Sequence, residues 1–219
     1  MARFASKIGK IGTGSIFSPT YRREKNRTGT FLRIGVLGGS FNPIHFGHLR
    51  LAEEAREALR LDRVLFIPAL RRPHKPQHGL VDGRHRLAMV RLAIAGQPAF
   101  AVSDVELQRP GPSYTVDTLM TLRRQSGARA RLFFLCGADT LQELKIWKDL
   151  DRVLQLCTFV VATRPGYPWR PRRGLTRLTM TPLAISASDI RRRVAEQHSI
   201  RYLVPDAVER YIARHRLYP

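Results

Sequence analysis

Two histidines, His45 and His48, follow a glycine pair in the stretch Gly38-Gly39-Ser40-Phe41-Asn42-Pro43-Ile44-His45-Phe46-Gly47-His48. Two imidazoles that face a phosphate can donate hydrogen bonds to the charge that builds at phosphorus during an in-line displacement. Gly47 leaves no side chain between these histidines and a ligand. A zinc site would need a third ligand that the spacing does not supply, and helix capping explains neither the glycine nor the second histidine. The stretch therefore favours catalysis at a phosphate group.

The glycine pair itself predicts an anion-binding turn. It directly follows the expected strand 33–37 and precedes a helix that begins near Phe46. Glycines let backbone N–H groups approach an anion closely, and the N-terminus of the next helix adds partial positive charge. The spacing matches neither the GxGxxG dinucleotide fingerprint nor a P-loop.

Strand-like and helix-like patterns alternate along the rest of the chain. This order predicts an α/β, Rossmann-like, doubly wound and mostly parallel sheet with helices on both faces and a small C-terminal helical part. Ligands of such sheets bind beyond the carboxyl ends of the strands, where the strand order reverses. The expected strands are 33–37, 64–67, 100–102, 131–136 and 158–163, and the expected helices, after that near Phe46, are 82–95, 115–125, a stretch including 150–156, 188–196 and 205–215.

We expect a flexible basic N-terminal extension over residues 1–30 and a single domain over residues 31–219. The extension has seven Lys or Arg and one acid, Glu24, and lacks a sustained apolar pattern. The apolar runs of the chain fall far short of the roughly 18 to 20 residues that cross a bilayer, so we expect a soluble, cytoplasmic protein. Cys136 and Cys157 have no zinc-site spacing and are expected to be buried, reduced thiols.

The net charge of +21 predicts attraction to polyanions without choosing among them. RNA binding is the alternative from a different functional class. Because recognised RNA-binding signatures and interleaved aromatic residues are missing, we do not expect nucleic acid as the main partner. The sequence leaves the oligomeric state open, a homo-oligomer included.

The stretch Gly38–Leu49 resembles the signature of the nucleotidyltransferases that share an HxGH motif with class I aminoacyl-tRNA synthetases. Over residues 33 to 215 the chain is similar to bacterial nicotinate-mononucleotide adenylyltransferases. The motifs that carry this likeness are Pro73-His74-Lys75, Pro112-Ser113-Tyr114-Thr115-Val116-Asp117-Thr118-Leu119, Gly137-Ala138-Asp139, Trp147, Arg164-Pro165-Gly166 and Ile185–Arg191.

The resemblance implies an enzyme that joins nicotinate mononucleotide to the AMP half of ATP and releases pyrophosphate, a step of NAD biosynthesis. His45, His48, Lys75 and Arg191 would be catalytic, with His48 stabilising the transition state. Mg²⁺ is the expected cofactor; it would bridge the phosphates of ATP, and no protein ligands are expected for it. The implied ATP-binding residues are Gly38, Gly39, Ser40, Phe41, His48, Asp139, Ile185, Ser186, Ser188 and Arg191. Those for nicotinate mononucleotide are Gly39, Ser40, Lys75, Tyr114, Thr115 and Trp147.

Several of these residues also have structural interpretations. An indole stacks on a flat pyridine ring, but Trp147 would on sequence alone belong to the core or an interface. Asp139 could accept a ribose hydroxyl, cap a helix, or do both. Lys75 could be a solvated loop lysine.

The chain departs from the family pattern at two places. Ala187 replaces a hydroxyl residue, while Ser188 can still cap the following helix and contact phosphate. Asn42, where many relatives have Asp, keeps an acceptor but loses a charge, and we expect little effect on the reaction. Phosphopantetheine adenylyltransferase and a preference for nicotinamide mononucleotide are the alternatives within the enzyme class.

Overall fold

A computed structural model describes residues 31–73, 78–163, 168–181 and 183–219. Within them, six strands form one sheet in the order β3-β2-β1-β4-β5-β6, and every neighbouring pair is parallel. The prediction of a doubly wound, parallel α/β sheet is therefore confirmed, except that β6 was not expected. The strands are β1 (Leu32–Gly39), β2 (Arg63–Pro68), β3 (Phe100–Val102), β4 (Ala130–Gly137), β5 (Thr158–Thr163) and β6 (Leu175–Thr179).

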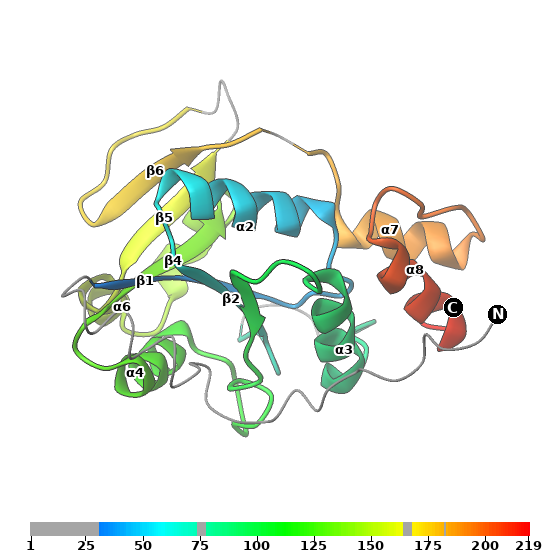
Figure 1. The fold of residues 1–219 in the computed structure, drawn as a ribbon, viewed down its shortest axis with the longest axis horizontal. Coiled ribbons are helices and arrows are strands. Elements are labelled where there is room, and N and C mark those ends of the chain that lie inside the picture. Colours follow the sequence, from blue (N-terminus) through cyan, green and yellow to red (C-terminus); the bar gives the residue numbers. More distant parts are fainter. Residues whose placement is uncertain (1–30, 74–77, 164–167, 182) are drawn as a thin grey trace.

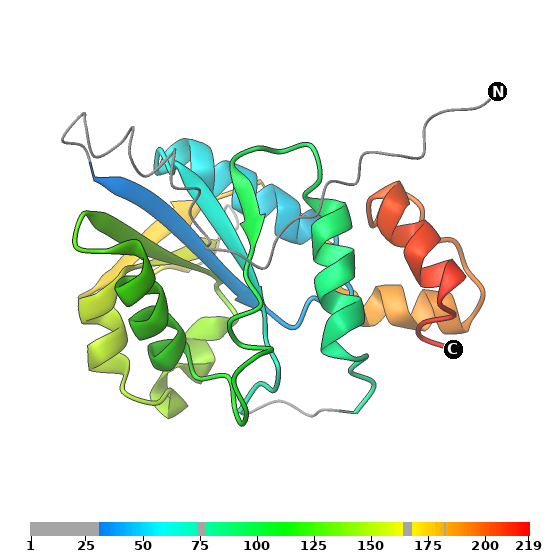
Figure 2. The same cartoon turned by 60° about the horizontal axis from the view of Figure 1, so that its bottom comes forward.

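Helices cover both faces of the sheet, with α2 and α3 on one face and α4 and α6 on the other (Figures 1 and 2). Leu37 and Phe66 point into the core beneath α2 and α3, whereas Ile34 and Val36 point into the core beneath α4 and α6. The helices are α2 (Phe46–Ala58), α3 (Gly83–Ala93), α4 (Thr115–Ser126), α5 (Thr140–Glu143), the short 3-10 helix η1 (Leu144–Ile146), α6 (Leu150–Leu156), α7 (Ala187–Ala195) and α8 (Asp206–Arg214).

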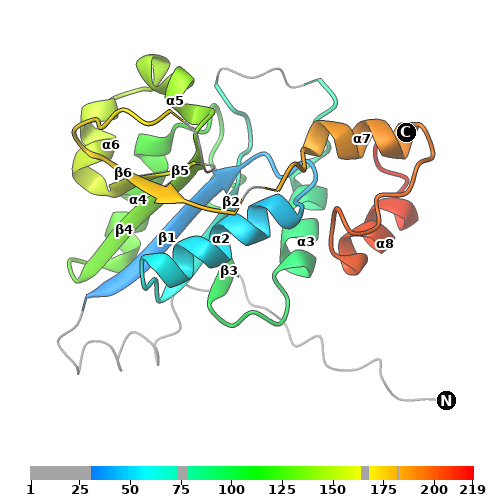
Figure 3. The ribbon, with the colours of Figure 1, turned by 90° about the horizontal axis from the view of Figure 1, so that it is seen from above.

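The last two helices lie beside the sheet and not on it. Figure 3 shows α7 and α8 beyond the edge that carries α3, and α8 packs against α3. Their apolar residues Ile190, Val208 and Ile212 are buried in the same core as α2 and α3. The C-terminal helices thus extend one core layer toward the start of α2.

Both cysteines are free, as predicted; Cys136 is buried, whereas Cys157 was expected to be buried and is only half-buried. Burial raises the pKa of Cys157 to about 12 and that of Cys136 further still, so both thiols stay protonated. No helix in the described ranges combines the length and the apolar character needed to cross a membrane.

Candidate active site

The predicted phosphate turn lies at the point where the strand order reverses. β1 pairs with β2 on one side and with β4 on the other, and Leu37 of β1 is opposite Leu135 of β4. The glycines that end these strands, Gly38-Gly39 and Gly137, therefore lie side by side at the carboxyl edge of the sheet. This is where open α/β sheets bind their ligands.

His45 and His48 are brought together at the start of α2. His45 is the residue before the helix, and the two ring centroids are 3.8 Å apart. The backbone N–H of His45 donates to Nδ1 of His48 at 3.3 Å. Because a backbone N–H only donates, neutral His48 keeps its proton on Nε2. The geometry thus leaves the Nε2–H of His48 as a hydrogen-bond donor.

Both imidazoles are neutral at about pH 7. Burial lowers the pKa of His45 to about 4. Burial, with a smaller contribution from His45, holds the pKa of His48 well below its ordinary value. Positive charge at the turn must therefore come from other residues.

The histidine rings are closely packed: the His45 ring lies against Gly47, and the His48 ring against Phe41. A Cβ atom on Gly47 would lie 3.0 Å from Cε1 and Nδ1 of His45 and 3.8 Å from the carbonyl oxygen of Ile185. The Phe41 ring is buried and meets the His48 ring edge-on at 5.1 Å. Since the Phe41 ring lies in the core, any contact of this residue with ATP would have to come from its backbone.

Arg191 supplies one of the charges at this turn. Its Nη1 donates to the backbone oxygen of Asn42 at 2.8 Å and its Nη2 to the hydroxyl of Ser188 at 3.3 Å. Ser186 caps α7 by accepting the N–H of Asp189 at 3.1 Å. The prediction that Ser188 caps this helix is wrong, because α7 begins at Ala187 and Ser188 already lies in its first turn.

Arg86 is a second cation at the turn, and the sequence analysis missed it. Its side chain is 1% exposed. The guanidinium donates to the carbonyl oxygens of Ser40 at 2.9 Å, Ala69 at 2.6 Å and Val81 at 2.9 Å. Burial lowers the pKa of Arg86, but an arginine starts high enough to remain charged. One buried cation thus joins the β1–α2 turn to both ends of the segment between β2 and α3.

Tyr114 and Thr115 lie where the sequence predicted, at the N-terminus of α4. The helix begins at Thr115, with Tyr114 as the preceding residue. The Nζ of Lys148 lies 4.7 Å from the centre of the Tyr114 ring and 3.4 Å from a carboxylate oxygen of Asp117. This end of α4 therefore combines helix amides with an exposed ammonium group, a setting that suits an anion.

Trp147 and Asp139 lie on the segment after β4. The half-buried Trp147 ring meets Phe134 and Phe159 edge-on, each at 5.6 Å, so part of it belongs to the core. Asp139 precedes α5 but makes no side-chain capping bond. Its Oδ1 lies only 2.5 Å from where a Cβ on Gly137 would be. The exposed carboxylate therefore folds over the end of β4, at the reversal point.

A buried network behind α4 was also missed from the sequence. The Thr118 hydroxyl donates to the buried carboxylate of Glu106 at 2.6 Å and accepts from Arg109 at 3.1 Å. Burial raises the pKa of Glu106. The Ser113 hydroxyl accepts the N–H of Leu70 at 3.0 Å. The Ser113 bond holds the residues before α4 against the segment after β2, and the Thr118 bonds hold α4 against the segment after β3.

Comparison with known proteins agrees with this arrangement. The cytidylyltransferase-like family matches residues 36–193. A relative from Thermomicrobium roseum, named "probable nicotinate-nucleotide adenylyltransferase", is 48% identical over 196 residues, which cover 85% of this chain and 91% of that protein. A relative of the same name from Thermus thermophilus is 47% identical over 188 residues, 85% of this chain and 100% of that protein. The chain belongs to the nicotinate-nucleotide adenylyltransferases.

Solved structures share the fold of this adenylyltransferase. The Plasmodium falciparum nicotinic acid mononucleotide adenylyltransferase complexed with NaAD has a TM-score of 0.71 at 18% identity, covering 85% of this chain and 97% of that one. The same protein complexed with APC has a TM-score of 0.69 at 18% identity, covering 85% and 96%.

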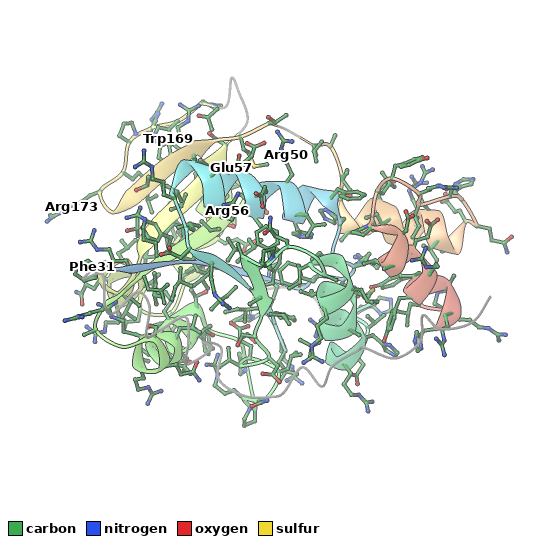
Figure 4. All side chains as sticks on the ribbon, in the orientation of Figure 1. Phe31, Arg50, Arg56, Glu57, Trp169 and Arg173 are labelled. Atoms are coloured by element: carbon green, nitrogen blue, oxygen red, sulfur yellow. The ribbon has the colours of Figure 1, made fainter. Side chains whose placement is uncertain are left out.

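Some predicted residues of this adenylyltransferase lie outside the described ranges, namely Lys75 and Arg164-Pro165-Gly166. A surface hollow lies apart from the turn, between the C-terminal half of α2 and β6, lined by residues that include Glu57 and Leu178. Figure 4 labels Glu57 there, together with the α2 residues Arg50 and Arg56. Since the histidines lie at the other end of α2, this hollow is no part of the site.

Proposed function

We propose that this chain transfers the adenylyl group of ATP to nicotinate mononucleotide, giving nicotinate adenine dinucleotide and pyrophosphate in NAD biosynthesis. A phosphate oxygen of the mononucleotide forms a bond to the α-phosphorus of ATP while the bond to the α,β-bridging oxygen breaks. The observation that carries the proposal is the close pair of imidazoles, His45 and His48, beside Arg191 at the reversal point. Family membership supports the choice of substrates.

The triphosphate of ATP would lie on the β1–α2 turn. Backbone N–H groups of Gly38-Gly39-Ser40 would contact its oxygens, and Arg191 would bind the β- or γ-phosphate. The Nε2–H of His48 would donate to the charge that develops at the α-phosphate, with His45 beside it, and the Lys75 ammonium would add positive charge at the phosphates. The attacking phosphate is already ionised, so positioning and charge stabilisation supply the catalysis and no general base is required.

The two nucleosides would lie on either side of this turn. On the ATP side, Asp139 would accept ribose hydroxyls. Further contacts there would come from the backbone of Phe41 and from Ile185, Ser186 and Ser188. On the acceptor side, Trp147 would stack on the pyridine ring and the N-terminus of α4, at Tyr114 and Thr115, would receive the nicotinate carboxylate.

Magnesium would enter with ATP, bound to its phosphates and otherwise hydrated. The described residues contain no group of three or more His, Cys, Asp or Glu that could hold a metal ion. The turn offers hydrogen-bond donors for phosphate oxygens and few carboxylates, and this set of groups suits ATP that brings its own magnesium ion. Chelation by EDTA should stop turnover, and added Mg²⁺ should restore it.

Pyrophosphate release tests the proposal, with Mg-ATP and, separately, nicotinate mononucleotide, nicotinamide mononucleotide or 4′-phosphopantetheine. We expect preferential turnover of nicotinate mononucleotide. His48→Ala should lower kcat by about 10²- to 10³-fold, as the loss of a transition-state donor does, and leave ATP affinity within a few-fold. His198→Ala, at an exposed histidine beyond α7, is the control. A near-normal kcat for His48→Ala would remove His48 from the mechanism.

A further inference from the structure

Asn42 connects the β1–α2 turn to three distant parts of the chain. Its side chain is 6% exposed. Its Nδ2 donates to the carbonyl of Gly79 at 2.8 Å, and its Oδ1 accepts the N–H of Val81 at 3.3 Å and the hydroxyl of Tyr218 at 3.0 Å. Its backbone oxygen accepts the Arg191 bond. These four hydrogen bonds to Asn42, which lies three positions before His45, all come from residues outside the turn.

The orientation of the Asn42 amide follows from its partners. The Gly79 carbonyl can only accept and the Val81 N–H can only donate, so Nδ2 faces the first and Oδ1 the second. The Tyr218 hydroxyl then donates to Oδ1. Asn42 thus acts as donor and acceptor at once, which adds to the acceptor role expected from the sequence.

Tyr218 is well placed to hold this contact. It follows α8, is 7% exposed and belongs to the core that also contains Phe41 and Ile190. Burial raises the pKa of its hydroxyl, although Arg191 and Arg86 lie close enough to oppose this effect, so the hydroxyl stays a donor near pH 7. Tyr218 therefore lies near Arg86 and Arg191, the two arginines that contact the β1–α2 turn.

We propose that Tyr218 is a positioning residue for ATP: its hydroxyl holds Asn42, and with it the backbone carbonyl that Arg191 contacts, in the arrangement that receives the triphosphate. This proposal rests on the proposed function in one respect, namely that the nucleotide bound at the turn is ATP. It predicts an effect on ATP alone, because no hydrogen bond in the described residues joins Tyr218 to the N-terminus of α4, where the acceptor would bind.

The test compares Tyr218→Phe with a matched control. Tyr211→Phe removes another hydroxyl from the same C-terminal part, one that bonds to Nδ1 of His85 at 3.0 Å and, within the described residues, is not among the hydrogen-bond partners of Asn42. The Kd of Mg-ATP is measured calorimetrically without acceptor, and KM for each substrate is measured by pyrophosphate release. We expect Tyr218→Phe to weaken ATP binding by about threefold to tenfold, which one buried hydrogen bond supports. Tyr211→Phe should change the Kd by less than about twofold, and KM for nicotinate mononucleotide should stay unchanged in both.

Asn42→Ala gives a second, independent test because it removes the acceptor and keeps the tyrosine. It should weaken ATP binding at least as much, and adding Tyr218→Phe to it should weaken binding no further. The proposal is overturned if Tyr218→Phe binds ATP like the wild type, if Tyr211→Phe weakens it equally, or if the two changes at Asn42 and Tyr218 add independently. Absence of turnover with nicotinate mononucleotide would instead contradict the proposed function, because the Kd comparison needs no acceptor.

Discussion

Replacing Arg86 by methionine should strongly destabilise the chain and disorder the phosphate turn. The arginine is fully buried, and its guanidinium contacts one carbonyl group of the β1–α2 turn and one at each end of the segment between β2 and α3. Methionine fills a similar volume without a donor. The carbonyls of Ser40, Ala69 and Val81 would then lose this partner, the bonds to Ser40 and Val81 at part-buried positions and the bond to Ala69 in the interior.

The size of the effect can be worked from these contacts. Hydrogen bonds from a charged donor contribute about 1.5–3 kcal/mol each, and three are lost. Part of this loss is offset because methionine has no charge to desolvate, so the expected net cost is about 3–5 kcal/mol. With a urea m-value of about 2 kcal/mol/M, the midpoint of unfolding should fall by about 1.5–2.5 M.

Urea unfolding followed by the fluorescence of the two tryptophans, Trp147 and Trp169, measures this shift. Arg91→Met, at an exposed arginine of the same helix, should change the free energy of unfolding by about 0.5 kcal/mol or less. Activity measured well below the midpoint should also fall for Arg86→Met, because the Ser40 carbonyl loses its partner. A midpoint within about 0.3 M of the wild type would refute the reasoning, since it corresponds to a net contribution of roughly 0.6 kcal/mol.

Three further predictions concern the histidines and the N-terminal extension. Gly47→Ala places a methyl group 3.0 Å from the His45 ring, so we expect a large loss of kcat with unchanged circular dichroism; full activity would contradict the packing argument. The pKa of His45 is about 4 in the folded chain, against an ordinary value of 6.5. Between these two pH values the unfolded chain therefore binds more protons at His45 than the folded chain does. Lowering the pH from 6.5 to 4 should thus reduce the free energy of unfolding by up to about 3 kcal/mol through His45. Between about pH 7 and about pH 5, the urea midpoint should therefore fall less in His45→Asn than in the wild type. Equal falls in the two proteins would contradict the low pKa of His45 in the folded chain. Removing residues 1–30 should leave folding and turnover intact, which size-exclusion chromatography and the pyrophosphate assay check; a chain that no longer folds would contradict the proposed boundary.

The central strands and most helices could be predicted because each carries a strong local pattern. Strand β6 could not, because Leu175-Thr176-Arg177-Leu178-Thr179 has only two apolar residues and only Leu178 is buried. It is an edge strand, paired on one side by β5, so its position depends on that partner more than on its own composition. The sequence predicted a helical stretch after β4 that includes Leu150–Leu156 but not its division into separate helices, because the four-residue α5 is too short for a helical period to be visible.

The turn that carries His45 and His48 could also be predicted from its strong local sequence pattern. The residues that hold the turn in place could not. Arg86 did leave a signal: it lies three and four residues before the buried Met89 and Val90, on the apolar face of α3, where a charged residue needs partners. No local signal marks Tyr218, because its partner Asn42 is 176 positions away in the sequence. Contacts at such separations are decided by the topology.

Because α7 and α8 lie beside the sheet, we expect the enzyme to lose its site before its central sheet unfolds. An opening that releases these two helices leaves all six strands paired but breaks the contacts of Arg191 and Tyr218 with Asn42 together. Local openings of this kind require less free energy than global unfolding. Mild heat or denaturant should therefore inactivate the protein before the sheet melts, and a nucleotide bound across both parts would slow hydrogen exchange in α7 and α8 more than in the central strands.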